Sequence, residues 1–217
     1  MMLNLFSVFD PSTGLFSLNW FSMMTFLFLP TPYWKAPGKL ISILINAYMK
    51  IMTEVMMHIK TSKPTILMVS MFSYILTINV LGLLPYVFTT SAHLSVSLAI
   101  ALTMWTSLMI YGWLNSTNSM FTHLVPLGTP PMLMPFMVMI ESISNIIRPG
   151  SLAVRLTANM IAGHLLMSLL GGNLTHNFTL MMIMMWLFMG LMVFELAVSF
   201  IQSYVFMTLS TLYSSEI

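Results

Sequence analysis

The last third of this 217-residue chain carries a few ionisable side chains inside long apolar stretches. An arginine at the centre of a lipid bilayer costs roughly 2.5–3.5 kcal/mol on insertion scales, and its guanidinium stays protonated. Carboxyl and imidazole groups in such places can instead take up and release protons. Together, carboxyl and imidazole groups could transfer protons, while the arginine stays a fixed cation beside them. The ionisable residues are Glu141, Arg148, Arg155, His164 and Glu195, with Glu216 near the C-terminus.

Helical spacing groups these side chains on separate faces. On a helix of 3.6 residues per turn, Arg155 and Asn159 share a face one turn apart. His164 lies nine residues beyond Arg155, which turns it to nearly the opposite face about 13 Å farther along the axis. Two further polar stripes are predicted, one formed by Glu141, Ser144, Asn145 and Arg148 and one by Glu195, Ser199 and Gln202.

Each of these residues also has an ordinary structural explanation. Arg148 could do no more than pair with Glu141 or with loosened backbone carbonyls, and His164 could be a packing histidine. Arg155 could form a buried bridge with Glu195; otherwise its anion belongs to a partner. A proton route across a membrane needs titratable groups at different depths, divided by one cation that cannot relay a proton. The sequence meets that requirement.

Composition indicates a lipid environment. Hydrophobic residues make up 58% and charged residues 6% of the sequence, with a mean hydropathy of +0.93, whereas an average soluble domain is about a quarter charged. The chain has no cysteine, which excludes disulfides and thiolate metal sites, and we find no nucleotide or zinc motif. A formal net charge of +2 does not indicate a nucleic-acid partner. We therefore expect a membrane protein that is not an enzyme, with no cofactor and no metal.

The apolar runs predict an all-α integral membrane protein with about five membrane helices plus an interfacial amphipathic helix, in a single membrane domain over 1–217. A first transmembrane helix is expected over 15–29 and two more over 65–114. The lysine-rich segment 38–60 is expected to lie in the interface on the inner side. The last two helices, over 130–213, are too long for a perpendicular span of about 30 Å. Five crossings then leave the N-terminus outside and the C-terminus inside.

Three segments of the C-terminal half are distinctive: "VPLGTPP" at 125–131, "LAVRLTANMIAGHLL" at 152–166 and "FELAVSFIQSYVF" at 194–206. Together they closely resemble the family of mitochondrial ATP synthase subunit a. The resemblance implies a multi-pass stator of the F0 part in the mitochondrial inner membrane, with its last two helices tilted against a rotating c-ring. It also implies two aqueous half-channels that reach the ring, and contacts with lipid and with other stator subunits (b, subunit 8 and small membrane subunits).

The resemblance also suggests individual roles. Arg155 would face the ring and separate the two half-channels, and Glu141 would serve the half-channel on the matrix side. His164 and Glu195 would line the half-channel on the intermembrane-space side. The other residues that the resemblance includes are Asn159 and Gln202 as polar neighbours of the arginine, with Arg148 and Glu216 as additional candidates.

Two rival interpretations stay open. A proton-pumping subunit of a respiratory complex would use lysine–glutamate series in broken helices, usually with more spans, whereas this chain has no lysine after Lys63. A purely structural membrane anchor predicts that neutral replacements of Glu141, His164 and Glu195 are tolerated.

Overall fold

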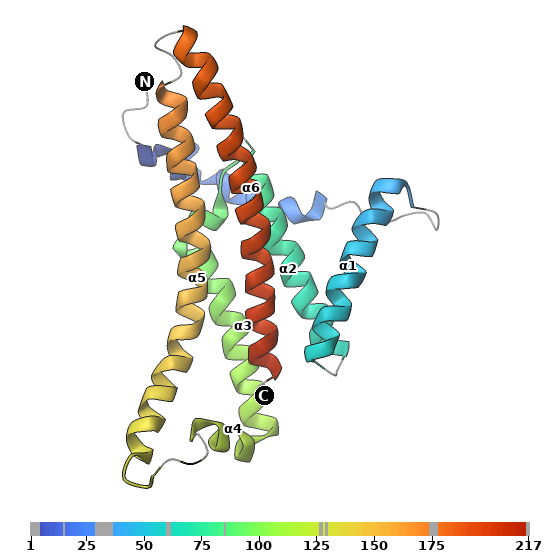
Figure 1. Cartoon of the computed structure of the whole chain (residues 1–217), viewed down its shortest axis with the longest axis vertical. Coiled ribbons are helices and arrows are strands. Elements are labelled where there is room, and N and C mark those ends of the chain that lie inside the picture. Colours follow the sequence, from blue (N-terminus) through green and yellow to red (C-terminus); the bar gives the residue numbers. More distant parts are fainter. Residues whose placement is uncertain are drawn as a thin grey trace.

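The computed structural model describes residues 5–14, 16–28, 37–59, 62–84, 86–125, 128, 130–173 and 178–215. Every regular element within these ranges is a helix, which confirms the all-α class. Three short 3-10 helices and six α-helices follow one another along the chain (Figure 1). They are η1 (Leu5–Phe9), η2 (Leu18–Phe28), α1 (Lys39–His58), α2 (Ser62–Gly82), η3 (Thr90–Ala92), α3 (Leu94–Asn115), α4 (Thr117–Leu124), α5 (Met134–Asn173) and α6 (Phe178–Ser215).

Five helices are long and apolar enough to cross a membrane within the described ranges: α1, α2, α3, α5 and α6. The last four match the apolar runs predicted over 65–114 and 130–213. At about 1.5 Å per residue, the 40 residues of α5 and the 38 of α6 measure about 60 and 57 Å. Both exceed a hydrocarbon core of about 30 Å, so these two helices must tilt or project from the membrane.

The sequence predicts a first transmembrane helix over 15–29, and that this segment crosses the membrane stays a prediction. The described part of that segment forms η2, an 11-residue 3-10 helix, which spans about 22 Å at roughly 2 Å per residue. Aromatic side chains of η2 pack against the rest of the bundle. Trp20 lies 5.9 Å from Phe88 and Phe26 lies 5.4 Å from Tyr74 between ring centroids. The length of this apolar run is compatible both with a helix that spans the membrane and with a segment that packs on the surface of the bundle.

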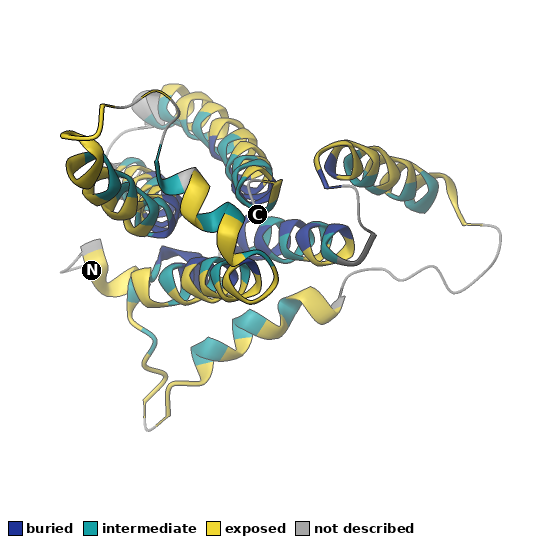
Figure 2. Cartoon of the chain, turned by 90° about the horizontal axis from the view of Figure 1, so that it is seen from below, coloured by how far each residue is buried: buried dark blue, intermediate teal, exposed yellow. Residues whose placement is uncertain are grey.

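Helix α1 leans away from the bundle and is mostly exposed (Figure 2). It is anchored near its C-terminal end, where Val55 and Ile59 are buried in one cluster with Met207 of α6. Beside them the Tyr204 hydroxyl donates a hydrogen bond of 3.3 Å to Glu54 Oε2. This contact accounts for an acidic residue on a largely apolar face. That α1 lies in the interface over 38–60 stays a prediction.

Helices α2, α3, α5 and α6 form the bundle that holds the polar residues. Helix α5 packs against α3 and α6, and α6 packs against α2. A second apolar cluster joins all four helices: Ile75, Ala101, Leu152, Ala153, Leu156 and Phe206. Figure 1 shows α5 and α6 running antiparallel, with the C-terminus at the same end as the beginning of α5. Helix α5 continues through Pro149 without a break. The ionisable residues are therefore strung along one long helical hairpin.

Candidate functional site

Arg155 lies near the middle of α5 on its exposed side. Its neighbours Leu152, Ala153 and Leu156 are 8%, 0% and 6% exposed and face the bundle. At about 100° per residue, Arg155 lies roughly a third of a turn from the middle of that buried face, and its side chain is exposed. Within the described ranges we find no hydrogen bond or ion pair for it, and thus no bridge to Glu195. The arginine is presented to whatever lies outside the bundle.

Glu195 of α6 is buried against α5, with 8% of its surface exposed. Gly163 lies against it there: a methyl group on this glycine would lie 2.6 Å from Glu195 Oε1 and 2.7 Å from Cδ. The carboxyl can lie so close to the backbone of α5 only because residue 163 has no side chain. Neither carboxyl oxygen has a hydrogen-bond partner among the described protein atoms. Since burying a polar group without a partner is costly, this carboxyl needs water or a group from another molecule.

His164 follows Gly163, so it lies at the same level of α5 as the Glu195 carboxyl. Its ring is half-buried and meets the Phe9 ring edge-on, with centroids 6.3 Å apart. Its Nε2 atom is buried and has no protein partner in the described part of the chain. The structure thus places two titratable groups that are 31 residues apart in the sequence at the same level of the hairpin.

Glu141 and Arg148 form an ion pair near the beginning of α5, as the predicted polar stripe suggests. Arg148 Nη2 lies 3.7 Å from Glu141 Oε1, and the two side chains are 28% and 38% exposed. The guanidinium also lies over the Tyr213 ring of α6, with Cζ 5.0 Å from its centroid. Glu141 and Arg155 are fourteen residues apart, about 21 Å along the helix. The Glu141 carboxylate is therefore well separated from Arg155, with Arg148 between them along α5.

The remaining predicted residues lie between or beyond these groups. Asn159 is half-buried one turn after Arg155, and Gln202 is half-buried on α6 two turns from Glu195. Glu216 lies outside the described residues. Among the described residues, no group of three or more histidine, cysteine, aspartate or glutamate side chains could hold a metal ion.

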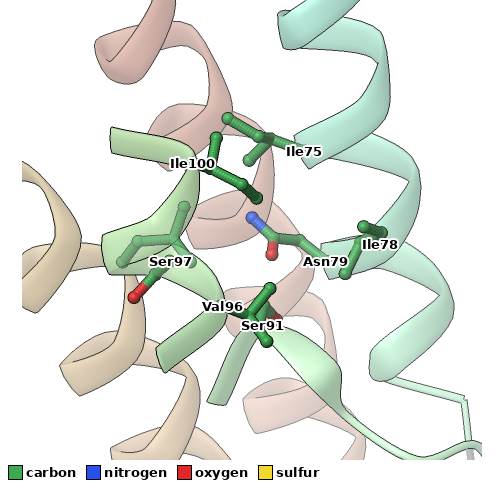
Figure 3. A pocket seen from close by; sticks show the side chains of 8 residues that line it. Ile75, Ile78, Asn79, Ser91, Val96, Ser97 and Ile100 are labelled. Atoms are coloured by element: carbon green, nitrogen blue, oxygen red, sulfur yellow. The ribbon is translucent and has the colours of Figure 1, made fainter. Parts of the chain in front are cut away.

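A small, mostly apolar cavity that the sequence analysis missed lies between α2, η3 and α3, and Leu156 of α5 also lines it. Asn79 is 1% exposed, and neither atom of its amide has a partner among the described residues; the same holds for the hydroxyl of Ser91. Figure 3 shows the Asn79 side chain pointing from α2 toward Ile100 of α3. The sequence signal was available, because Asn79 is the one amide residue within the apolar run 65–88.

Comparison with known proteins assigns the chain to a family. A model of the ATP synthase A chain family matches residues 14–215. The chain is 52% identical to ATP synthase subunit a of Anopheles gambiae over 225 residues, 51% identical to that of Drosophila melanogaster over 227 and 50% identical to that of Locusta migratoria over 233. Each comparison covers the full length of both chains. The chain therefore belongs to the ATP synthase A chain family, the non-catalytic, proton-translocating subunits of the membrane part of ATP synthase.

Proposed function

We propose that this chain forms two half-channels that load and unload carboxylates of a c-ring and so couple proton flow to rotation and ATP synthesis. Family membership makes it a subunit of the ATP synthase complex and a multi-pass protein of the mitochondrial inner membrane. The further steps concern its side chains. Arg155 is the gate, His164 and Glu195 serve one half-channel, and Glu141 serves the other.

One observation carries the proposal: Arg155 is exposed and has no described anion within the chain, while acidic groups lie on both sides of it along the hairpin. Glu141 is about 21 Å away in one direction. His164 lies about 13 Å away in the other, at the level where Glu195 meets Gly163. An arginine retained in a membrane needs an anion, and a ring carboxylate that passes the exposed face of α5 supplies one.

The half-channel of His164 and Glu195, on the intermembrane-space side, is called the outer half-channel. It is supported by buried polar groups that have no hydrogen-bond partner among the described residues. Glu195, His164 and Asn79 each have such atoms among the described residues, and buried waters in proteins typically bond polar groups that have no protein partner. A proton from the intermembrane space would pass His164 and Glu195 to reach a ring carboxylate. Once neutral, that carboxyl can turn into lipid at a much lower cost than a charged group.

The half-channel of Glu141, on the matrix side, is called the inner half-channel. Glu141 lies in the first part of α5 and is 38% exposed. Figure 1 shows that α5 begins at the end of the bundle that carries the C-terminus. A ring carboxyl that arrives from the lipid would release its proton toward Glu141. Arg155 then holds the ionised carboxylate and blocks a direct leak, with Asn159 and Gln202 as polar neighbours. Each charge that crosses 100 mV supplies about 2.3 kcal/mol, so several protons are needed for one ATP.

The orientation of the chain follows from its lysines. Helix α2, which begins with Ser62 and Lys63, starts at the same end of the bundle as the C-terminus (Figure 1). Because segments rich in lysine face the inner side, this end would lie in the matrix and the N-terminus in the intermembrane space. We call it the inner end and the opposite one the outer end. The exposed surface of α1 would meet lipid or other stator subunits.

The test is Glu195→Gln in the assembled complex. Glutamine keeps the size of the side chain beside Gly163 but cannot ionise, so proton-driven ATP synthesis should fall about 100-fold or more, as for loss of an acid–base group. The control is Leu196→Met, at an exposed neighbouring position, which should leave synthesis unchanged. Complex content is measured by native gel. Normal synthesis by Glu195→Gln would favour a structural anchor over a proton channel.

A further inference from the structure

We propose that Arg148 and Tyr213 form a brace that positions the Glu141 carboxylate at the inner end of the proton route. The inference rests on the proposed role of Glu141 as the group that receives protons from the ring. It adds two residues to that function: a cation that holds the carboxylate, and an aromatic ring on the next helix that holds the cation.

The geometry of the brace connects two helices. Glu141 and Arg148 are two turns apart on α5, and their side chains reach along the helix until Arg148 Nη2 and Glu141 Oε1 are 3.7 Å apart. A further contact of the guanidinium crosses to α6, where Cζ lies 5.0 Å from the centroid of the Tyr213 ring. Cations within about 6 Å of an aromatic centroid are attracted by its π face. Arg148 is therefore held from both sides.

The aromatic side of the brace is itself fixed by packing. Tyr213 lines a small cavity with Trp105 of α3 and Pro149 of α5, so its ring is held where three helices meet. Pro149 also lacks the N–H that would bond the Asn145 carbonyl, which removes one helical hydrogen bond beside the brace. A contact between the two helices at this point compensates for the weakened backbone of α5.

The acidic side of the brace needs positioning. Glu141 is partly exposed, and a free glutamate side chain has several rotamers, whereas proton transfer requires a partner within hydrogen-bond reach. Arginine is suited to the task because it offers several donors in a fixed plane and stays protonated, so it orients the carboxylate without becoming a rival proton carrier. Arg148 is thus a positioning residue that acts through Glu141.

The experiment measures proton-driven ATP synthesis by the ATP synthase complex in sealed vesicles, per amount of assembled complex. Arg148→Gln and Tyr213→Leu should each lower synthesis about three- to fivefold, because each removes one partly exposed contact. Tyr213→Phe, which keeps the ring, should match the unmodified chain, and Arg148→Lys should restore part of the rate. In a Glu141→Gln background, Arg148→Gln should cause no further loss.

The possible results distinguish failure of the proposed inner half-channel from failure of the brace. If Glu141→Gln alone has no effect, the proposed inner half-channel is wrong. If Glu141→Gln lowers synthesis but Arg148→Gln lowers it by the same factor with and without Glu141, the brace does not act through that carboxylate and the inference is wrong. Equal rates for Tyr213→Leu and Tyr213→Phe would also overturn it. If Arg148→Gln prevents assembly of the complex, the comparison of Tyr213→Leu with Tyr213→Phe still tests whether the brace exists.

Discussion

At the inner end of the α5–α6 hairpin, Glu141 is 38% exposed and meets Arg148 at 3.7 Å, whereas toward the outer end Glu195 is 8% exposed and its carboxyl has no hydrogen-bond partner among the described residues. A partly exposed ion pair contributes little to stability but orients its members. A buried carboxyl without a partner must be served by water or by another molecule. On the proposed function, the two ends would therefore handle protons under different constraints, by orientation of Glu141 at the inner end and by close packing of Glu195 toward the outer end.

The comparison predicts its largest effect at Gly163. In Gly163→Ala the new methyl group would lie 2.6 Å from Glu195 Oε1, and the end of the flexible glutamate side chain would have to move. The helices can stay in place, so assembly should be normal. ATP synthesis should fall steeply, because a displacement of about 1 Å in a reacting group can cost about 100-fold in rate.

Gly171→Ala is the matched control on the same helix, since a methyl group there would meet nothing within 4 Å. It should leave synthesis unchanged and stabilise α5 slightly, because alanine is the better helix former. Equal synthesis by the two alanine variants, measured per assembled complex, would contradict a critical position of Glu195 against Gly163.

A smaller effect is expected at Asn79, in the cavity between α2, η3 and α3. If this amide holds water for the outer half-channel, Asn79→Leu should lower ATP synthesis several-fold. Stability should not fall, because replacing a buried polar group that has no partner by an apolar one of similar shape is close to neutral or stabilising. Thermal melting of the complex and its synthesis rate are measured together. Ile78→Leu, in the same cavity lining, serves as the control; unchanged synthesis by Asn79→Leu would remove the cavity from the outer half-channel.

The sequence predicts some of these features because they depend on local spacing. The apolar runs locate α2, α3, α5 and α6, since apolar runs of that length favour membrane helices. The Glu141–Arg148 pair follows from residues two turns apart on one helix. That the run at 15–29 crosses the membrane stays a prediction, because this run is barely long enough for a span and its aromatic side chains contact other parts of the bundle.

Other features depend on contacts that no spacing encodes. Glu195 meets Gly163 across two helices, 32 residues away in the sequence, and a glycine in an apolar helix gives no sign of what approaches it. Tyr213 reads as one more aromatic residue near the end of α6 until the Arg148 guanidinium is placed over its ring. The Asn79 cavity likewise forms only when α2, η3 and α3 come together.

The most direct test of the account is Arg155→Gln, with proton-driven ATP synthesis and passive proton leak measured in the same membranes. The account predicts that synthesis is lost and that leak rises, because the cation that separates the two half-channels is gone while Glu141 and Glu195 remain. Complex content by native gel shows whether assembly is intact. Normal synthesis in an assembled complex would contradict the account, and so would loss of synthesis without any rise in leak.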